Sequence, residues 1–261
     1  MLTNFLHIIH FLKICLVTFL TLFLFSCTTN KDNEIEYLER SLYQIYNSAL
    51  NDLLNLDYEE ASLQFEEVER QHPYSEWSKK AIIMSAYSSY KNKDFIKTEA
   101  NLNRFLNIYP ASNLAPYAQY LLGLNYFDQI IEVERDQTSV TKSLEIFKLI
   151  LDRYPDTNYA KDAYFKIIFL ENQLAAKELD IAMTYLGLKK YIAALKRLKY
   201  VVNNYQTTNY TPEALHRLVE IYLILGVKEE ALVNARVLGH NYPDSIWYKL
   251  SYNLLKKKKI F

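Results

Sequence analysis

Apolar residues recur along this chain at helical spacing, and one arrangement of them occurs five times. A small residue is followed four positions later by an apolar residue, three positions later by another, and five positions later by Pro. Steps of four and three place these side chains on one face of a helix, and Pro ends the helix because it cannot continue its hydrogen bonds. The copies are Ala61, Phe65, Val68 and Pro73; Thr98, Leu102, Phe105 and Pro110; Ser143, Phe147, Ile150 and Pro155; Ala194, Leu198 and Val201, with Gln206 in the Pro position; and Ala231, Ala235, Leu238 and Pro243.

A second apolar-periodic segment precedes each copy, so each repeat is predicted to be two helices. Examples are Leu42, Ile45, Ala49 and Leu53 before the first copy, and Leu215, Leu218, Tyr222 and Leu225 before the fifth. The copies begin 37, 45, 51 and 37 residues apart, longer than the tetratricopeptide period of about 34 residues, as longer helices or connections require. Stacked pairs share a continuous core that a lone pair cannot form. We predict an all-α fold, a superhelical solenoid of five tetratricopeptide-like helix pairs over residues 37–250.

Two stretches depart from the regular repeat. Residues 128–141 lengthen the connection between the helices of the third pair. Residues 158–186 contain no Pro or Gly and keep the apolar spacing, which predicts one long helix joining an N-terminal half (about 37–156) to a C-terminal half (about 157–250). Residues 251–261, which include a run of lysines, are predicted to be a basic tail.

The N-terminal segment differs from the rest of the chain. It contains one charge, Lys13, and its apolar core of 12 residues has the length of a signal-peptide core rather than of a membrane span, which needs about 20. The sequence LFSC ending at Cys27 resembles a bacterial lipobox, which predicts a signal peptide at 1–26 and a lipidated tether at 27–36. Thr28, rather than Asp, favours sorting to the outer membrane. The alternative is a plain signal peptide or an uncleaved anchor, with Cys27 incidental.

Composition and motifs argue against several classes of function. Lys plus Arg and Asp plus Glu number 30 each, so no net charge favours nucleic acid. With 4 Gly and 6 Pro the chain lacks the turn residues of a β-sandwich or barrel. It has no P-loop, G-x-S-x-G or H-E-x-x-H motif. His72, His216 and His240 lie in three different repeats, so we expect no metal site, no cofactor and no enzymatic activity.

Several segments resemble the BamD family of outer-membrane assembly lipoproteins. The most specific is RYPDTNYA at residues 153–160. Others are AYSSY at 86–90, YAQY at 117–120, RDQT at 135–138 and LAAKE at 174–178. The resemblance extends over about residues 37–248 and includes the lipobox.

The resemblance implies a role in protein assembly without catalysis. Members of the family lie at the periplasmic face of the outer membrane, bind the periplasmic domains of the barrel-forming insertase BamA beside other assembly lipoproteins, and help deliver unfolded outer-membrane proteins. We therefore expect these partners and a lipid anchor in the outer membrane. Arg197 matches a family Arg at the insertase contact, where its planar guanidinium suits a carboxylate. The alternative for Arg197 is a solvated helix face.

The resemblance also implies a groove for client proteins in the N-terminal half. Tyr74 and Trp77 follow Pro73, in a loop where the family carries an aromatic residue, and Tyr87 and Tyr90 lie on the next predicted helix. Barrel proteins end in strands rich in aromatic residues, so aromatic walls with polar tips suit such clients. Core packing is the alternative for all four, and the favoured one for Tyr87 and Tyr90.

Three other functions compete with this interpretation. Another periplasmic repeat lipoprotein, acting in pilus assembly or envelope constriction, is the main alternative, although it needs neither the RDQT segment nor the long central helix. A lytic transglycosylase would require an appended catalytic domain, for which no stretch is long enough or rich enough in Gly. A cytosolic adaptor is disfavoured by the N-terminal segment.

Overall fold

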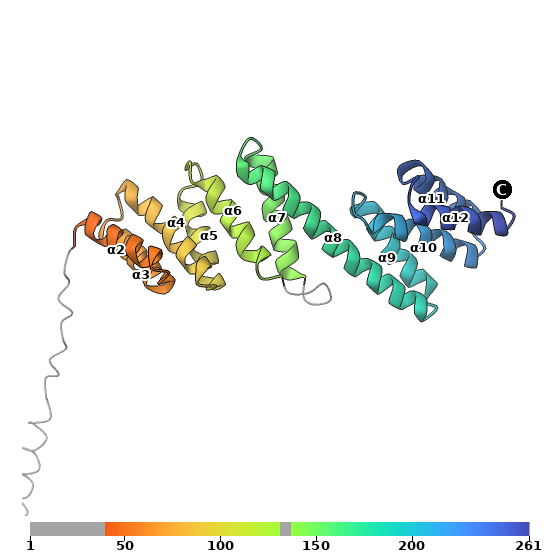
Figure 1. The fold of residues 1–261 in the computed structure, drawn as a ribbon, viewed down its shortest axis with the longest axis horizontal. Helices are drawn as coiled ribbons and strands as arrows, with labels where there is room; N and C mark the ends of the chain where they lie inside the picture. The colour runs from red at the N-terminus through yellow and green to blue at the C-terminus, as the bar shows by residue number, and fades with distance from the viewer. Residues whose placement is uncertain (1–39, 131–136, 261) are drawn as a thin grey trace, which may run out of the picture. The chain divides into compact units, whose positions relative to one another are not determined.

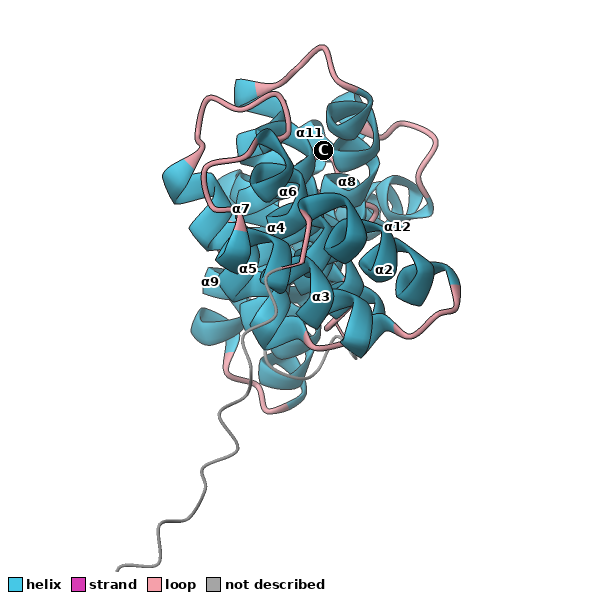
Figure 2. Ribbon diagram, turned by 90° about the vertical axis from the view of Figure 1, so that its left-hand side faces the viewer, coloured by secondary structure: helices cyan, strands magenta, loops and turns pink. Residues whose placement is uncertain are grey.

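The computed structural model describes residues 40–130 and 137–260, and every regular element in these ranges is an α-helix (Figures 1 and 2). The predicted signal peptide, Cys27 and the tether lie outside the described residues. Contacts group Leu42–Phe261 into one compact unit. The helices are α2 (Leu42–Leu54), α3 (Tyr58–Gln71), α4 (Glu76–Lys91), α5 (Phe95–Ile108), α6 (Ala115–Phe127), α7 (Thr138–Arg153), α8 (Asn158–Gly187), α9 (Tyr191–Asn204), α10 (Thr211–Ile224), α11 (Lys228–Asn241) and α12 (Ile246–Lys257).

The helices pack as five successive pairs, from α2 with α3 to α10 with α11. The first helix of each later pair also contacts the second helix before it, and the first helices α4 and α6, and α6 and α8, contact each other. Figure 1 shows the pairs side by side in chain order. The predicted tetratricopeptide-like solenoid of five pairs is confirmed, and α12 takes the place of the first helix of a sixth pair.

The repeated apolar pattern forms the core of this stack. Of its fifteen members before the Pro position, fourteen are 0 % exposed and Ala235 is 8 % exposed. Where a member is polar, the structure satisfies it: the Ser143 hydroxyl donates to the carbonyl of Gly123 at 3.1 Å. Gly123 also leaves room for the ring of Phe147, because a Cβ there would lie 2.6 Å from it. The spacing therefore identified the buried face of each second helix.

Each second helix ends two residues before the Pro position, including the one that lacks Pro. Helix α9 ends at Asn204 although Gln206 stands where the others have Pro. In all five, the first residue beyond the helix donates its backbone N–H to the carbonyl of the last apolar residue of the pattern, as Tyr205 does to Val201 at 2.9 Å. The local backbone geometry, and not Pro alone, therefore ends the helix.

A Ser or Thr follows the Pro position by two residues in all five repeats, a regularity absent from the pattern described above. These residues, which we call the turn residues, are Ser75, Ser112, Thr157, Thr208 and Ser245. The backbone N–H of each donates at 3.1 Å to the carbonyl three residues earlier, which closes a turn. The hydroxyls of Ser75 and Thr157 also accept a backbone N–H at the start of the next helix. The turn residues thus provide a common origin for counting positions along each first helix.

The long central helix is confirmed, since α8 spans Asn158–Gly187. The buried core changes partway along it: Leu170 belongs to a cluster shared with α7, whereas Ala175 belongs to one shared with α9 and α10. The two halves of the stack therefore meet inside α8, and not near residue 156 as expected. The prediction for 128–141 was too long, because residues 138–141 are already helical in α7; residues 131–136 lie outside the described residues.

The prediction of a basic tail from residue 251 is wrong for most of its length. Helix α12 runs to Lys257, and Ser251 and Leu255 within it are buried at 0 % and 1 % exposure. Leu255 lies four positions after Ser251, so both face the core while Lys256 and Lys257 remain exposed. The apolar spacing of a helix therefore continues through the segment that contains the lysines.

Candidate protein-interaction surfaces

The length of α8 changes what covers it. Seven positions after the turn residue, Ile82 of α4 and Leu215 of α10 are each 1 % exposed, but Tyr164 of α8 is 54 % exposed. One position later, His216 of α10 is 4 % exposed and Phe165 of α8 is 68 % exposed. The following pair packs along the second half of α8 and leaves these aromatic side chains in the first half uncovered.

The same displacement opens a groove between α7 and α9, across α8. Its volume is about 830 Å³, and its α8 wall is formed by Leu174, Lys177, Glu178 and Ile181. At about 100° per residue these side chains are centred about a quarter of a turn from Tyr164 and about half a turn from Phe165 around the axis of α8. We call this space the α8 groove. The remaining lining residues are Gln137, Thr141, Leu144, Glu145 and Lys148 near α7, and Arg197, Tyr200 and Tyr205 near α9.

Arg197 lies in this groove and is held by an ion pair within the chain. Its Nη1 is 3.0 Å from Oε2 and 3.2 Å from Oε1 of Glu178, a residue of the LAAKE segment. The Arg197 side chain is 44 % exposed and that of Glu178 is 19 % exposed. A guanidinium has five N–H donors, so the bond to Glu178 leaves donors for a second carboxylate. The Arg197 side chain is therefore both paired within the chain and accessible from outside.

The aromatic residues expected to bind clients do not form one site. Tyr74 is fully exposed in the turn between α3 and α4. Trp77 is not on a loop as predicted but in the first turn of α4, where its ring packs edge-on against Tyr43 and Tyr46 of α2 at centroid distances of 5.9 and 4.8 Å. Trp77 and Tyr90 lie near opposite ends of α4, about 20 Å apart at the helical rise. Trp77 therefore attaches the first pair to the second.

Tyr87 and Tyr90 are half-buried, which agrees with core packing as the favoured alternative. Tyr87 packs against the cluster shared by α4, α5 and α6. The Tyr90 hydroxyl donates to the carboxylate of Asp128 at the end of α6. Burial, together with this hydrogen bond, raises the pKa of Tyr90.

Three further tyrosines extend this region along the first helices, and sequence reasoning did not identify them as a site. The ring centroid of Tyr159 in α8 lies 5.7 Å from that of Tyr117 and 5.2 Å from that of Tyr120, both in α6. The Tyr120 hydroxyl donates to Asp162 at 2.6 Å. Burial, followed by the proximity of Tyr87 and Tyr159, raises the pKa of Tyr117 to about 12. Tyr117 and Tyr120 belong to the YAQY segment, but nothing in the local sequence shows that they meet Tyr159.

The described ranges contain no group of three or more His, Cys, Asp or Glu side chains arranged to hold a metal ion. Nor is any helix within residues 40–130 and 137–260 long and apolar enough to cross a membrane. Of His72, His216 and His240, His216 is buried and its Nδ1 lies 2.8 Å from the Ser251 hydroxyl of α12. The features that the structure does present are grooves and exposed aromatic side chains.

Comparison with known proteins agrees with these features. A family model described as an outer membrane lipoprotein, YfiO, matches residues 39–247. The outer membrane protein assembly factor BamD of Caulobacter vibrioides is 42 % identical over 225 residues, which cover 86 % of this chain and 74 % of that protein. BamD of Rickettsia prowazekii is 37 % identical over 230 residues, covering 88 % and 91 %.

Among solved structures, the tetratricopeptide domain of P58(IPK) matches 83 % of this chain and 66 % of that chain, with 15 % identity and a TM-score of 0.43. A tetratricopeptide protein of Thermus thermophilus matches 82 % of this chain and 97 % of that chain, with 18 % identity and a TM-score of 0.36. These values are too low to support an argument about function. The family model and the close relatives are decisive, and this chain belongs to the BamD family of outer membrane lipoproteins.

Proposed function

We propose that this protein is a non-enzymatic scaffold subunit of the machinery that assembles β-barrel proteins in the outer membrane. Its relatives are named outer membrane protein assembly factors. A solenoid of helix pairs provides extended surfaces for proteins. In this proposal Cys27 carries the lipid that anchors the chain at the periplasmic face of the outer membrane.

The insertase contact is proposed to lie in the α8 groove, at Arg197. The main support for this proposal is the position of the Arg197 guanidinium, which is half-exposed in the groove and oriented by Glu178. Preorganisation by Glu178 lowers the entropy lost when a partner carboxylate binds. Charge-assisted bonds to a carboxylate then contribute orientation as well as affinity.

Clients are proposed to contact the N-terminal pairs, where Tyr74 is free of the core and the tyrosines of α4, α6 and α8 present aromatic edges with hydroxyl tips. An extended segment with aromatic side chains fits such a surface. Photo-crosslinking from position 74 to the last strand of an unfolded barrel protein tests this contact. A cross-link yield no higher than that from exposed position 192, on α9 outside the α8 groove, argues against it.

The insertase contact is tested by recovery of partners from outer membranes in mild detergent. Arg197→Glu should abolish recovery of a large barrel protein with periplasmic repeat domains, whereas Arg153→Glu, an exposed Arg at the end of α7, should not. The double variant Arg197→Glu with Glu178→Arg separates two explanations. It restores recovery if the pair matters only for the fold, and fails to restore it if Arg197 binds the partner. Recovery of pilus or division proteins without that barrel contradicts the proposal as a whole.

A further inference from the structure

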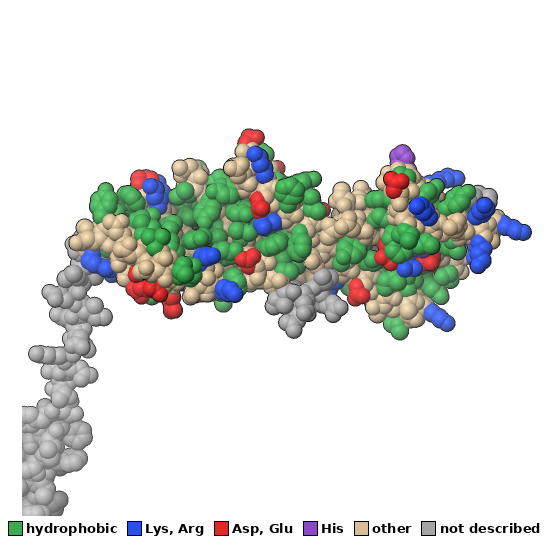
Figure 3. Space-filling model, viewed as in Figure 1, with side chains coloured by type: hydrophobic (Ala, Val, Ile, Leu, Met, Phe, Trp, Pro, Cys, Tyr) green, Lys and Arg blue, Asp and Glu red, His purple; other side chains and the backbone are tan. Residues whose placement is uncertain are grey.

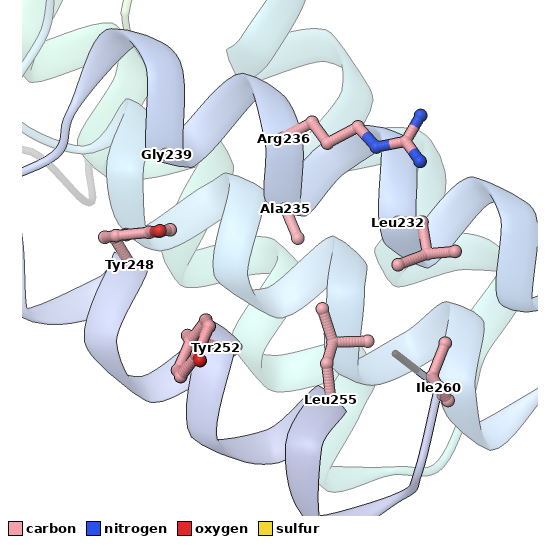
Figure 4. A pocket seen from close by; sticks show the side chains of 8 residues that line it. All are labelled: Leu232, Ala235, Arg236, Gly239, Tyr248, Tyr252, Leu255 and Ile260. Atoms are coloured by element: carbon pink, nitrogen blue, oxygen red, sulfur yellow. The ribbon is translucent and has the colours of Figure 1, made fainter.

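A second groove lies between α11 and α12, and its volume is about 520 Å³ (Figure 4). Its walls are mainly apolar and aromatic, formed by Leu232, Gly239, Tyr248, Tyr252 and Leu255, with Arg236 beside them. The ring of Tyr248 lies directly over Gly239, where a Cβ would be 2.6 Å from it. We call this space the α12 groove.

In a regular repeat, the space of the α12 groove would be filled by the second helix of the next pair. The corresponding space beside α3 and α4 is occupied by α5, whose Asn101 donates to Ser85 of α4 at 3.1 Å and to Glu66 of α3 at 3.2 Å. Among the described residues no helix occupies the space beside α11 and α12. Accordingly Tyr252 is 44 % exposed, whereas Ile82, at the same position after its turn residue, is 1 % exposed.

The charged residues of α12 and of the groove lining are all basic. Figure 3 shows Lys and Arg side chains gathered over this end of the described helices. Helix α12 has no Asp or Glu but carries Lys249, Lys256 and Lys257, and none of the residues lining the groove is acidic. Arg236 has no ion pair with any carboxylate in the described ranges. The lining of the groove therefore carries one positive charge, that of Arg236, and no negative one.

The position of Arg236 indicates where that negative charge belongs. Arg236 lies five residues after Ala231, and Glu66 lies five residues after Ala61, at the same point of the repeat. Glu66 pairs with Lys97 at 3.1 Å, and Lys97 directly precedes the small residue Thr98 of the next second helix. Arg236 therefore occupies the repeat position of Glu66 but carries the opposite charge. Its partner should be a carboxylate at the repeat position of Lys97, on the second helix of the next pair.

We propose that the α12 groove binds an acidic amphipathic helix of a partner protein, which completes a sixth pair with α12. Its apolar face, with residues spaced by four and three, packs on Tyr248, Tyr252 and Leu232, and a carboxylate before its small residue pairs with Arg236. The apolar walls distinguish this site from a purely electrostatic patch for lipid headgroups. Burial of aromatic rings beside one Arg is typical of the centre of a protein interface.

Two helices of this chain serve as matched probes, because both carry the repeated spacing but opposite charge. A peptide of residues 58–71 has five Glu and one Arg, whereas a peptide of residues 191–204 has three basic residues and no acidic one. Peptides of this length form little helix alone, so both are stapled on their polar face. Their binding to the full-length protein is measured by fluorescence anisotropy.

The acidic peptide should bind at least about tenfold more tightly than the basic one, the factor that corresponds to one charge-assisted contact. Arg236→Glu should remove this preference, and the matched variant Arg153→Glu should keep it. Equal binding of the two peptides, or an acidic peptide indifferent to Arg236→Glu, contradicts the proposal.

The natural occupant is tested with a photo-crosslinking residue in place of Tyr252, in intact outer membranes. Mass spectrometry of the cross-linked segment should show an acidic sequence with apolar residues spaced by four and three. Cross-links only to lipid, to a basic segment or to a second copy of this chain contradict it, as does the absence of any cross-link. Arg236→Glu leaves the α8 groove intact, and Arg197→Glu leaves the α12 groove intact, so the two proposals fail independently.

Discussion

Helix α4 and the first half of α8 have equivalent positions in the repeat but different surroundings. In α4, Ile82 and Ile83 are buried in a cluster with α5 and α6. In α8, Tyr164 and Phe165 at the same positions are exposed, because α8 is 30 residues long and the next pair packs farther along it. Whether a position is core or surface in this protein therefore depends on where the following pair docks.

The displacement that exposes Tyr164 and Phe165 also opens the groove that holds Arg197. Beside a regular pair of 16-residue and 14-residue helices, such as α4 and α5, the next pair packs directly against the equivalent positions. In the long helix, positions that are buried in α4 are therefore exposed and accessible. We expect substitutions in the covered region to affect stability and those in the uncovered region to affect binding.

The largest expected difference is between Ile82→Ala and Tyr164→Ala. Truncating a fully buried Ile leaves a cavity and costs about 2–5 kcal/mol of unfolding free energy. Truncating the exposed Tyr164 should cost within about 0.5 kcal/mol, as for other surface sites. Urea denaturation of the two variants measures both values. Similar losses for both variants would mean that α8 is covered in solution.

A break in α8 should separate the two halves of the stack. Gln173 lies where the core changes between Leu170 and Ala175, and Pro there removes a helical hydrogen bond and clashes with the preceding turn, at a cost of about 3 kcal/mol. We expect calorimetry of Gln173→Pro to resolve two transitions. Gln173→Ala is the control, and it should melt in a single transition like the parent protein.

The ion pair in the α8 groove should contribute little to stability. Arg197 is 44 % exposed, and exposed pairs contribute less than about 1 kcal/mol. Arg197→Ala should therefore leave the urea midpoint nearly unchanged while it weakens recovery of the insertase. A large loss of stability in this variant would assign Arg197 a structural role in place of the binding role.

The smallest effect is expected where α12 covers α10, and it should disappear in acid. A hydrogen bond with His216, and next one with Arg217, lowers the pKa of Glu220 from 4.5 to about 2. A carboxyl with a lowered folded pKa stabilises the fold above its unfolded pKa, and this contribution disappears as the pH falls from about 4.5 towards 2. Glu220→Gln should melt below the parent protein at pH 7, and the difference should vanish near pH 2.

Glu229→Gln, at an exposed position in the first turn of α11, is the control for Glu220→Gln. Its melting temperature should follow that of the parent protein at each pH. A difference between Glu220→Gln and the parent protein that persists at pH 2 would show that the carboxylate charge is not the cause.

Much of the fold follows from local spacing. Steps of four and three identified the buried residues of all five second helices, and the absence of Pro and Gly identified α8. The same reasoning misplaced Trp77, because Ser75 begins the helix sooner than Pro73 suggests. It also missed α12, because the run of lysines was interpreted as a tail. Lysines on the exposed side of a helix do not interrupt the apolar spacing on its buried side.

The candidate sites were less accessible to such reasoning. Arg197 was identified through a family resemblance, but its pairing with Glu178 joins residues 19 positions apart on two helices. The cluster of Tyr117, Tyr120 and Tyr159 joins two helices across a gap of about forty residues, as does the hydrogen bond from Tyr120 to Asp162, 42 positions away. No periodicity connects such positions, because it reports only the face of one helix.

The sequence alone therefore determined every helix pair but not α12, and it determined which face of each second helix is buried, because these depend on spacing over a few turns. Specific segments such as RYPDTNYA also showed which family the chain resembles. Only the tertiary structure decided which equivalent positions are covered, Ile82 but not Tyr164 or Tyr252, and where grooves open. The physical reason is that coverage depends on where one pair docks on another. That docking is set by the length of α8 and by packing among helices far apart in the chain.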